Sequence, residues 1–130
     1  MPRAAITTLT LMLTAGLAAG CHHRPPPQME ANPQGGEVGI QIVNHNFSDM
    51  DVFALENGGY RVRLGQATGK ATSVFVVPWR HLSTSGTIRL LAVPIGGTGR
   101  YTTGLLSVRP GSIVILTLED ILDQSSVSIF

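Results

Sequence analysis

Side chains that could bind a metal ion are densest between Asn44 and Asp51. Asn46 and Asp49 lie inside this segment, and calcium takes about six to eight oxygen ligands, often from Asp and Asn that alternate through a tight loop. The spacing matches no EF-hand, and Asn and Asp also dominate ordinary turns because their side chains bond to nearby backbone groups. The pattern therefore favours a turn over a metal site.

Two other features could take part in chemistry. The glycines of Gly96–Gly99 could approach a phosphate, but no Lys-Ser or Lys-Thr pair follows them and they join two predicted strands instead of opening a helix. His45 and His81 could serve as bases, yet the chain contains no nucleophile-elbow pattern and no Ser-x-x-Lys. Neither feature predicts a catalytic residue or a cofactor.

Neighbouring polar residues are equally uninformative about catalysis. Glu119, Asp120 and Asp123 follow one another closely, which suits the cap of a helical turn better than a proton-sharing pair. His22 and His23 have no Cys or acidic ligand at metal spacing. The sequence therefore predicts a protein that is not an enzyme, with no catalytic residue, no cofactor and no metal.

Aromatic and arginine side chains are the candidates for binding a partner, because these residue types dominate interaction hot spots. Trp79 and Arg80 directly follow Pro78, which ends a predicted strand, and Tyr60 and Tyr101 complete the set. A Trp in a loop also commonly covers the end of a sandwich core. That is the interpretation we favour for Trp79.

The chain from Glu37 to Phe130 must position these side chains, and it breaks into short β-like runs separated by Gly, Asn, Asp, Ser and Pro. About seven or eight strands in about ninety residues is the size of an immunoglobulin-like domain. The predicted fold class is all-β, a single small antiparallel β-sandwich. The paired cysteines that flank a Trp in true immunoglobulin domains are absent from the sequence.

A hairpin is the clearest local prediction. Asp51–Leu55 and Tyr60–Leu64 flank Glu56-Asn57-Gly58-Gly59, a turn signal. Side chains alternate across a strand, so one face of the second run should meet the core and the other the solvent. The expected core-facing residues are Tyr60, Val62 and Leu64, and the solvent-facing ones are Arg61 and Arg63.

One further run stands out because Ile113–Leu116 is apolar on both faces, which predicts a central strand covered on both sides. A helical turn is expected over Glu119–Gln124. The other predicted strands are Val38–Ile42, Thr72–Val77, Thr87–Val93, Tyr101–Val108, Ser112–Leu118 and Ser126–Phe130.

Residues 1–20 have the form of a signal peptide: Arg3 near the start, an apolar run over Ala4–Ala19, and small residues before Cys21. The run is shorter than the about 18 to 20 apolar residues that span a bilayer, and threonines interrupt it. We therefore expect an exported protein without a permanent transmembrane helix.

The stretch Leu17-Ala18-Ala19-Gly20-Cys21 resembles the lipobox of bacterial lipoproteins, in which the cysteine is diacylglycerylated and becomes the new amino terminus. The resemblance implies lipidation of Cys21, although Ala18 stands where Leu is commonest. Ala18 and Gly20 also suit ordinary signal peptidase, so secretion with a free thiol is the alternative. Because Cys21 is the only cysteine, it has no partner for a disulfide. His22, in place of the Asp that retains enterobacterial lipoproteins in the inner membrane, implies the outer membrane and a domain that faces the periplasm.

Residues 21–36 are rich in Pro, Gln and Gly, a composition that cannot build a core and is typical of an extended tether. The predicted organisation is thus a signal peptide over 1–20, the lipidation site and tether over 21–36, and the β-sandwich over 37–130. Nine Lys and Arg stand against eight Asp and Glu, and Arg3 belongs to the signal peptide. The balanced charge argues against a nucleic-acid partner.

The chain is similar to small bacterial envelope lipoproteins with a β-sandwich body, a resemblance that rests on the lipobox, the tether and the terminal strand after Arg109-Pro110-Gly111. We expect a non-enzymatic, lipid-anchored envelope protein whose partners are the membrane, through its lipid, and another envelope protein. The alternative is a small-ligand or glycan-binding module. A concave pocket lined by Trp79, Tyr60 or Tyr101 would favour that alternative, whereas a cluster of His45 or His81 with Asp49 or Asp51 would favour an enzyme.

Overall fold

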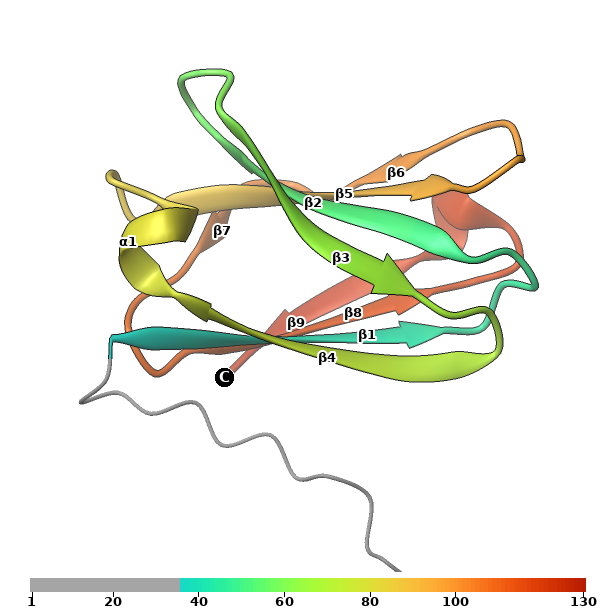
Figure 1. Ribbon diagram of the computed structural model, residues 1–130, viewed down its shortest axis with the longest axis horizontal. Coiled ribbons are helices and arrows are strands. Elements are labelled where there is room, and N and C mark those ends of the chain that lie inside the picture. Colours follow the sequence, from blue (N-terminus) through green and yellow to red (C-terminus); the bar gives the residue numbers. More distant parts are fainter. Residues whose placement is uncertain (1–35) are drawn as a thin grey trace, which may run out of the picture.

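The computed structural model describes residues 36–130, which form two packed sheets (Figure 1). Among residues 36–130, helix is confined to α1 (Trp79–Leu82) and to the 3-10 turn η1 (Leu122–Gln124), which falls within the helical turn expected near Glu119. The predicted all-β sandwich is confirmed. The signal peptide, Cys21 and the tether up to Gly35 lie outside the described residues.

The first sheet has the strand order β4-β1-β8-β9. Its strands are β1 (Glu37–Asn44), β4 (Ala71–Pro78), β8 (Ile113–Leu118) and β9 (Ser126–Ile129). The second sheet has the order β3-β2-β5-β6, and β7 also pairs with β5. Its strands are β2 (Met50–Glu56), β3 (Arg61–Ala67), β5 (Thr87–Pro94), β6 (Tyr101–Thr102) and β7 (Leu106–Ser107).

Two details of the predicted topology are wrong. β1 pairs with β8 in parallel, so the sandwich is not wholly antiparallel; parallel neighbours require a long connection, and the chain from β2 to β7 supplies it. The single strand expected over Tyr101–Val108 is divided into β6 and β7. Between them, the Thr103 hydroxyl accepts a hydrogen bond from the backbone N–H of Leu90 at 2.9 Å, so a side chain replaces one rung of the ladder.

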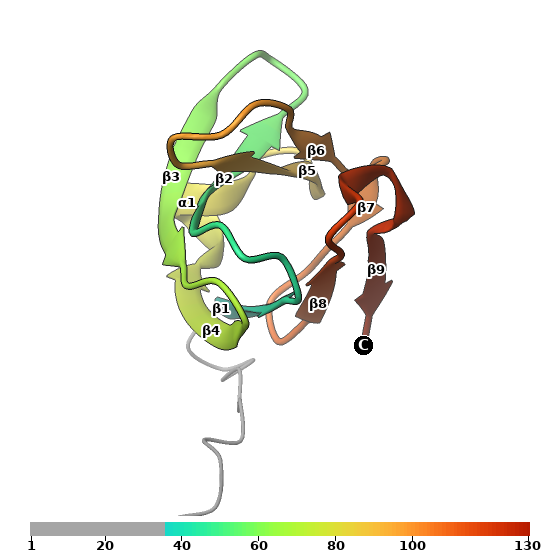
Figure 2. The same ribbon diagram turned by 90° about the vertical axis from the view of Figure 1, so that its right-hand side faces the viewer.

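The core fills the space between the sheets, which Figure 2 shows end-on. Each inner strand contributes alternate side chains, as expected for a sheet with one buried face. The charged side chains lie outside the space between the sheets, and the residues that fill it are apolar. Its fully buried members include Val38, Ile40, Ile42, Met50, Val52, Ile88, Leu90, Ala92, Val114, Leu116 and Leu118.

The predicted hairpin is confirmed, since β2 and β3 pair antiparallel across the Glu56–Gly59 turn. Leu64 packs against the core whereas Arg61 and Arg63 are exposed, as expected. The prediction for Tyr60 is wrong: its side chain is 72% exposed. Tyr60 precedes β3 and closes the turn, where its carbonyl accepts the Glu56 N–H at 2.9 Å, so the alternation of the strand does not extend to it.

Leu64→Ala should destabilise the domain by about 1 to 2 kcal/mol, because Leu64 packs against the core but is only partly buried. Arg63→Ala should cost about 0.5 kcal/mol or less, because Arg63 is exposed and its ion pair with Asp51, at 2.5 Å, lies at the surface. Urea melts of the two variants test this order. A larger loss for Arg63→Ala would contradict the observed faces of β3.

β8 lies between β1 and β9, so the expectation of a central strand is confirmed, but the expected cover on both faces is wrong. Val114, Leu116 and Leu118 face the core. Ile113 and Ile115 face outward and are only half-buried among residues 36–130. An apolar stripe is therefore left on the surface of the first sheet.

Candidate functional site

The loop rich in Asn and Asp is built from side chains that bond to its own backbone. Asn44 is buried; its side-chain amide donates to the carbonyls of Ser48 at 2.9 Å and Ala67 at 3.3 Å, and its Oδ1 accepts the Asn46 N–H at 3.0 Å. The Oδ1 of Asn46 in turn accepts the Ser48 N–H at 2.9 Å. The loop thus has the side-chain turns that the sequence favours.

The two aspartates of this loop also have protein partners. Asp49 accepts hydrogen bonds from Gln66 and from the Gly69 N–H, both at 2.8 Å, and Asp51 pairs with Arg63. The oxygens of Asp49 and Asp51 therefore bond to groups on β3 and in the β3–β4 turn, and they do not converge on one position where a metal ion could bind. Within residues 36–130, no three His, Cys, Asp or Glu side chains gather closely enough to hold a metal ion.

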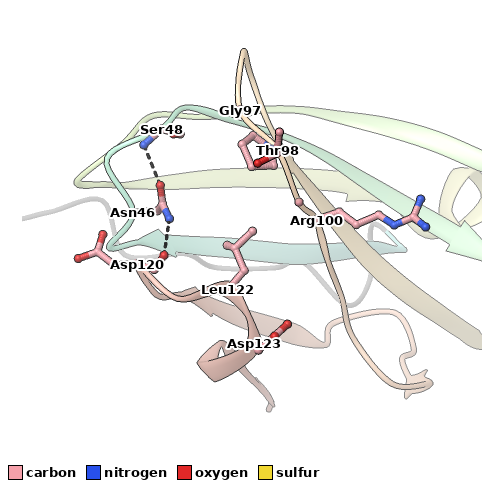
Figure 3. A pocket seen from close by; sticks show the side chains of 10 residues that line it. Asn46, Ser48, Gly97, Thr98, Arg100, Asp120, Leu122 and Asp123 are labelled. Atoms are coloured by element: carbon pink, nitrogen blue, oxygen red, sulfur yellow. Dashed lines mark hydrogen bonds between the residues drawn. The ribbon is translucent and has the colours of Figure 1, made fainter.

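A hollow of about 440 Å³ lies where this loop meets the Gly96–Gly99 loop and η1 (Figure 3). The Asn46 amide closes its floor by donating to the carbonyls of Glu119 at 3.3 Å and Asp120 at 3.1 Å. Figure 3 shows the Arg100 and Asp120 side chains pointing in opposite directions. The hollow therefore has no convergent charged groups that would hold a phosphate or a cation.

The two histidines considered as bases lie at opposite ends of the sandwich. His45 Nδ1 is 3.1 Å from Glu119 Oε1 in a surface pair, and His81 Nε2 accepts a long hydrogen bond from Arg80 Nε at 3.4 Å. Within residues 36–130, no hydrogen bond joins either histidine to Asp49 or Asp51. The cluster that would favour an enzyme is not formed among the described residues.

A second hollow, of about 550 Å³, separates the β2–β3 turn from α1. It brings together Tyr60 and Arg80, two of the four predicted interaction residues, with Val62, His81 and Leu82 as neighbours. The remaining lining residues are Glu56, Ser83 and Thr84. The floor is mostly apolar and the rim carries an arginine and a tyrosine, an arrangement that can hold a small group with an apolar body and a polar or anionic end.

Glu56 holds the two walls of this hollow together. Its Oε1 accepts hydrogen bonds from the Thr84 hydroxyl at 2.6 Å, the Thr84 N–H at 2.5 Å and the Ser85 N–H at 3.3 Å. These bonds favour the ionised carboxylate, so they lower the pKa of Glu56, with the Thr84 hydroxyl as the largest cause. The chain after α1 is thereby fastened to the end of β2.

This network predicts that Glu56→Gln loses stability in a pH-dependent way. A carboxylate whose pKa is lowered by folding stabilises the protein fully above its unfolded pKa of about 4.3, and this stabilisation is lost as the pH falls through the folded pKa. The difference in unfolding free energy between wild type and Glu56→Gln should therefore shrink as the pH is lowered from 7 toward 3. Urea melts across this range measure it, with Asp123→Asn as a control for net charge; a difference that grows with acid would contradict the network.

The other two predicted interaction residues, Trp79 and Tyr101, pack against the core of the domain. Trp79 packs against the core and donates its backbone N–H to the Gly36 carbonyl at 2.6 Å, so it covers one end of the sandwich. Tyr101 packs against the core as well, and its hydroxyl donates to the Ser125 carbonyl at 3.0 Å. We assign both a structural role.

Sequence reasoning missed a surface that forms only when the first sheet is assembled. On the outer side of this sheet, the residues paired across the four strands form rows of side chains. The central rows contain no charged residue. Val76 is 49% exposed, Val74 37% and Phe130 74%. We call this surface the uncharged face. Its outward positions are Gly39, which is itself buried between its neighbours, and Gln41, Val43, Thr72, Val74, Val76, Ile113, Ile115, Thr117, Ser126, Ser128 and Phe130.

The outer side of the second sheet is different in character. Arg61 and Arg89 flank Leu55 in one cross-strand row, and Arg63 pairs with Asp51. The Arg61 guanidinium also lies 3.6 Å from the centre of the Phe53 ring, which it shields from water. The two faces of the same sandwich therefore differ in charge, and only the first sheet leaves a neutral surface.

The fold and its surfaces define the chain as a small all-β sandwich. No protein-family model matches the sequence, and no curated protein matches it. A protein from Eubacterium rectale solved by NMR is similar at 13% sequence identity and a TM-score of 0.44, over 77% of this chain and 92% of that one. Over residues 36–130, no helix has the length and hydropathy needed to cross a bilayer.

Proposed function

We propose that this chain is a non-enzymatic, lipid-anchored protein of the bacterial envelope that docks a partner protein on its uncharged face. The observation that carries the proposal is the uncharged outer side of the first sheet. Val74 and Val76 are exposed on β4, and Phe130 is exposed at the opposite edge, after β9. The half-buried Ile113 and Ile115 of β8 lie between them, and these rows contain no charged side chain. Contiguous apolar surface of this kind on a soluble domain is typical of interaction sites.

The size and chemistry of the face restrict the partner. Four strands at a spacing of about 4.8 Å, each presenting three outward positions over about 13 Å, give a patch about 19 Å wide. A charged partner surface would lose its water without gaining an ion pair, so the partner should also be uncharged there. Gln41, Thr72 and Thr117 offer side-chain hydrogen bonds across an otherwise apolar contact.

The patch is smaller than the about 800 Å² per partner of a standard stable interface, so the contact should be weak between free proteins. Attachment of both proteins to one membrane raises their effective concentration and compensates for weak affinity. The lipid expected on Cys21 would provide that attachment. The lipid anchor would thus allow a weak contact at the uncharged face to be sufficient for docking.

Photo-crosslinking in the producing cell tests this docking. A photoreactive amino acid at Val76 should give a discrete protein adduct, whereas one at Leu105, which is 55% exposed away from the first sheet, should give none of the same mass. A second substitution on the face, Val74→Lys, should abolish the Val76 adduct. Equal adducts from both positions, or persistence of the adduct in the Val74→Lys variant, would contradict docking on this face.

A small-ligand or glycan-binding function is the second candidate, because the hollow lined by Tyr60 and Arg80 has the volume of a small-molecule site. The ring of Tyr60 could stack on a sugar, and Arg80 could bind a carboxylate. Mono- and disaccharides with and without a carboxylate, titrated into ¹⁵N-labelled protein, test the idea. Shifts that saturate around Tyr60 and vanish in Tyr60→Ala would support it, and shifts spread evenly over the surface would oppose it.

A further inference from the structure

Charges are segregated along the sandwich. The strands run between an end that carries α1, the β2–β3 turn and the β7–β8 turn, which we call the α1 end, and an end that carries the β1–β2, β3–β4, β5–β6 and β8–β9 connections, which we call the distal end (Figure 1). Four arginines lie at the α1 end against two glutamates, a formal net charge of +2 among the described residues. They are Arg61, Arg80, Arg89 and Arg109 against Glu37 and Glu56.

The distal end has the opposite sign. Two basic residues stand there against four acidic ones, a formal net charge of −2 among the described residues: Lys70 and Arg100 against Asp49, Glu119, Asp120 and Asp123. Lys70 is held in place by its ion pair with Asp120 at 3.1 Å and by the ring of Phe47 at 3.9 Å. The Arg63 to Asp51 pair lies between the ends and adds nothing to either. The domain is therefore dipolar although its total charge is balanced.

The chain enters the domain at the basic end. The Gly36 carbonyl accepts the Trp79 N–H at 2.6 Å, and the Glu37 carbonyl accepts the Gly111 N–H at 2.7 Å. The start of the domain therefore lies between α1, which carries Arg80, and the β7–β8 turn, which carries Arg109. Residues 21–35, which precede it, can span at most about 50 Å. Both arginines are exposed, and neither forms an ion pair with another residue of the described range 36–130.

From these observations we propose that the α1 end rests on a membrane surface of anionic phospholipids, with the exposed arginines on the headgroup phosphates. The proposal rests on the lipid anchor of the proposed function, because the anchor holds this end near the bilayer. Each Lys or Arg near an anionic bilayer adds about a fivefold preference for the surface, and the guanidinium suits phosphate oxygens. The acidic distal end would be repelled by the same surface.

This orientation has a consequence for the uncharged face. The strands of the first sheet run from the α1 end to the distal end, so a domain that stands on its α1 end holds both sheets roughly upright. The uncharged face then looks sideways along the membrane, where a partner anchored in the same bilayer would meet it. Lipid contact at the α1 end and protein contact on the uncharged face can occur together.

Fluorescence of Trp79, the only tryptophan of the chain, reports this contact because Trp79 lies in α1 beside Arg80. The full lipidated chain is reconstituted into phosphatidylcholine vesicles with and without phosphatidylglycerol, each carrying a lipid with a nitroxide on its headgroup. Trp79 should be quenched more strongly in the anionic vesicles. Raising the salt from about 0.15 M to about 1 M, which shortens the Debye length from about 8 Å to about 3 Å, should remove the difference.

Variants separate the two ends. Arg80→Gln and Arg109→Gln should each reduce the preference for anionic vesicles about fivefold, and Arg100→Gln, an exposed arginine at the distal end, should not reduce it. Equal quenching in neutral and anionic vesicles, or an equal effect of Arg100→Gln, would overturn the proposed orientation. Flotation with vesicles in high salt tests the lipid anchor separately. If Cys21→Ser no longer floats with the vesicles while the arginine variants still do, the anchor attaches the protein independently of the orientation of the domain.

Discussion

Leu116→Ala should destabilise the domain by about 2 to 5 kcal/mol, the loss expected when a fully buried leucine is truncated and a cavity remains. Leu116 lies at the centre of β8, between Ile42 of β1 and Val127 of β9, and its side chain enters the space between the sheets. Its neighbours are held by both sheets and cannot close the gap. Urea melts at neutral pH measure the loss as a shift of the midpoint with an unchanged slope.

Val76→Ala provides the matched control, because Val76 belongs to the same sheet but points outward and is 49% exposed. It should cost about 1 kcal/mol or less, since about half of the Val76 side chain is already exposed and no enclosed cavity would form. Equal losses for the two variants would mean that the uncharged face is covered by the protein itself. That result would remove the basis for a docking surface on the first sheet.

Gly69→Ala is the second substitution with a large expected effect. An added Cβ would lie 2.3 Å from the carbonyl oxygen of Phe47 and 2.8 Å from its carbonyl carbon, and both are backbone atoms. The turn cannot retreat without breaking the Gly69 N–H bond to Asp49 at 2.8 Å and the Lys70 N–H bond to Asn46 at 3.0 Å. We expect a loss of about 2 to 4 kcal/mol in unfolding free energy.

Gly58→Ala is the control for this effect, because a Cβ at Gly58 would meet no atom within 4 Å. Its cost should stay within about 0.5 kcal/mol. Thermal or urea melts of both variants give the comparison. If Gly69→Ala were as mild as Gly58→Ala, the loop from Asn46 to Asp49 would not be packed on the β3–β4 turn as described.

Local patterns in the sequence predicted the elements whose physics is local. Alternation of apolar and charged residues placed Leu64 inward and Arg63 outward, and the Asn and Gly residues after Glu56 predicted the hairpin turn. The same alternation failed at Tyr60, because a residue that closes a turn no longer obeys the pleat of the strand. The tendency of Asn to bond to nearby backbone groups in turns likewise predicted the role of Asn44. Its side-chain amide and carbonyl groups bond to the backbone of its own loop.

Features that depend on pairing between distant segments could not be predicted in this way. The uncharged face requires that Val74, Gln41 and Ile115 share one row, a register that no local pattern defines. The parallel pairing of β1 with β8 is likewise invisible before the sheet is assembled. A balanced total charge also concealed the separation of the arginines at the α1 end from the carboxylates at the distal end.

The candidate site shows the same division. Residue types alone identified Tyr60 and Arg80 as possible contacts, but only the fold joins them in one hollow. Trp79 and Tyr101, by contrast, pack against the core and cover it, so they do not line this hollow. The role of Glu56 could not be predicted from the sequence, because it depends on hydrogen bonds from Ser83, Thr84 and Ser85, which lie on a different segment of the chain.

Lipid attachment at Cys21 is the claim on which both the docking of a membrane partner and the orientation at the bilayer depend. Mass spectrometry of the mature protein extracted from membranes tests it most directly. The proposed function predicts a chain that begins at Cys21 and carries a diacylglyceryl group on that residue, and a Cys21→Ser variant that lacks the adduct and leaves the membrane fraction. An unmodified, soluble chain as the major wild-type product would contradict it.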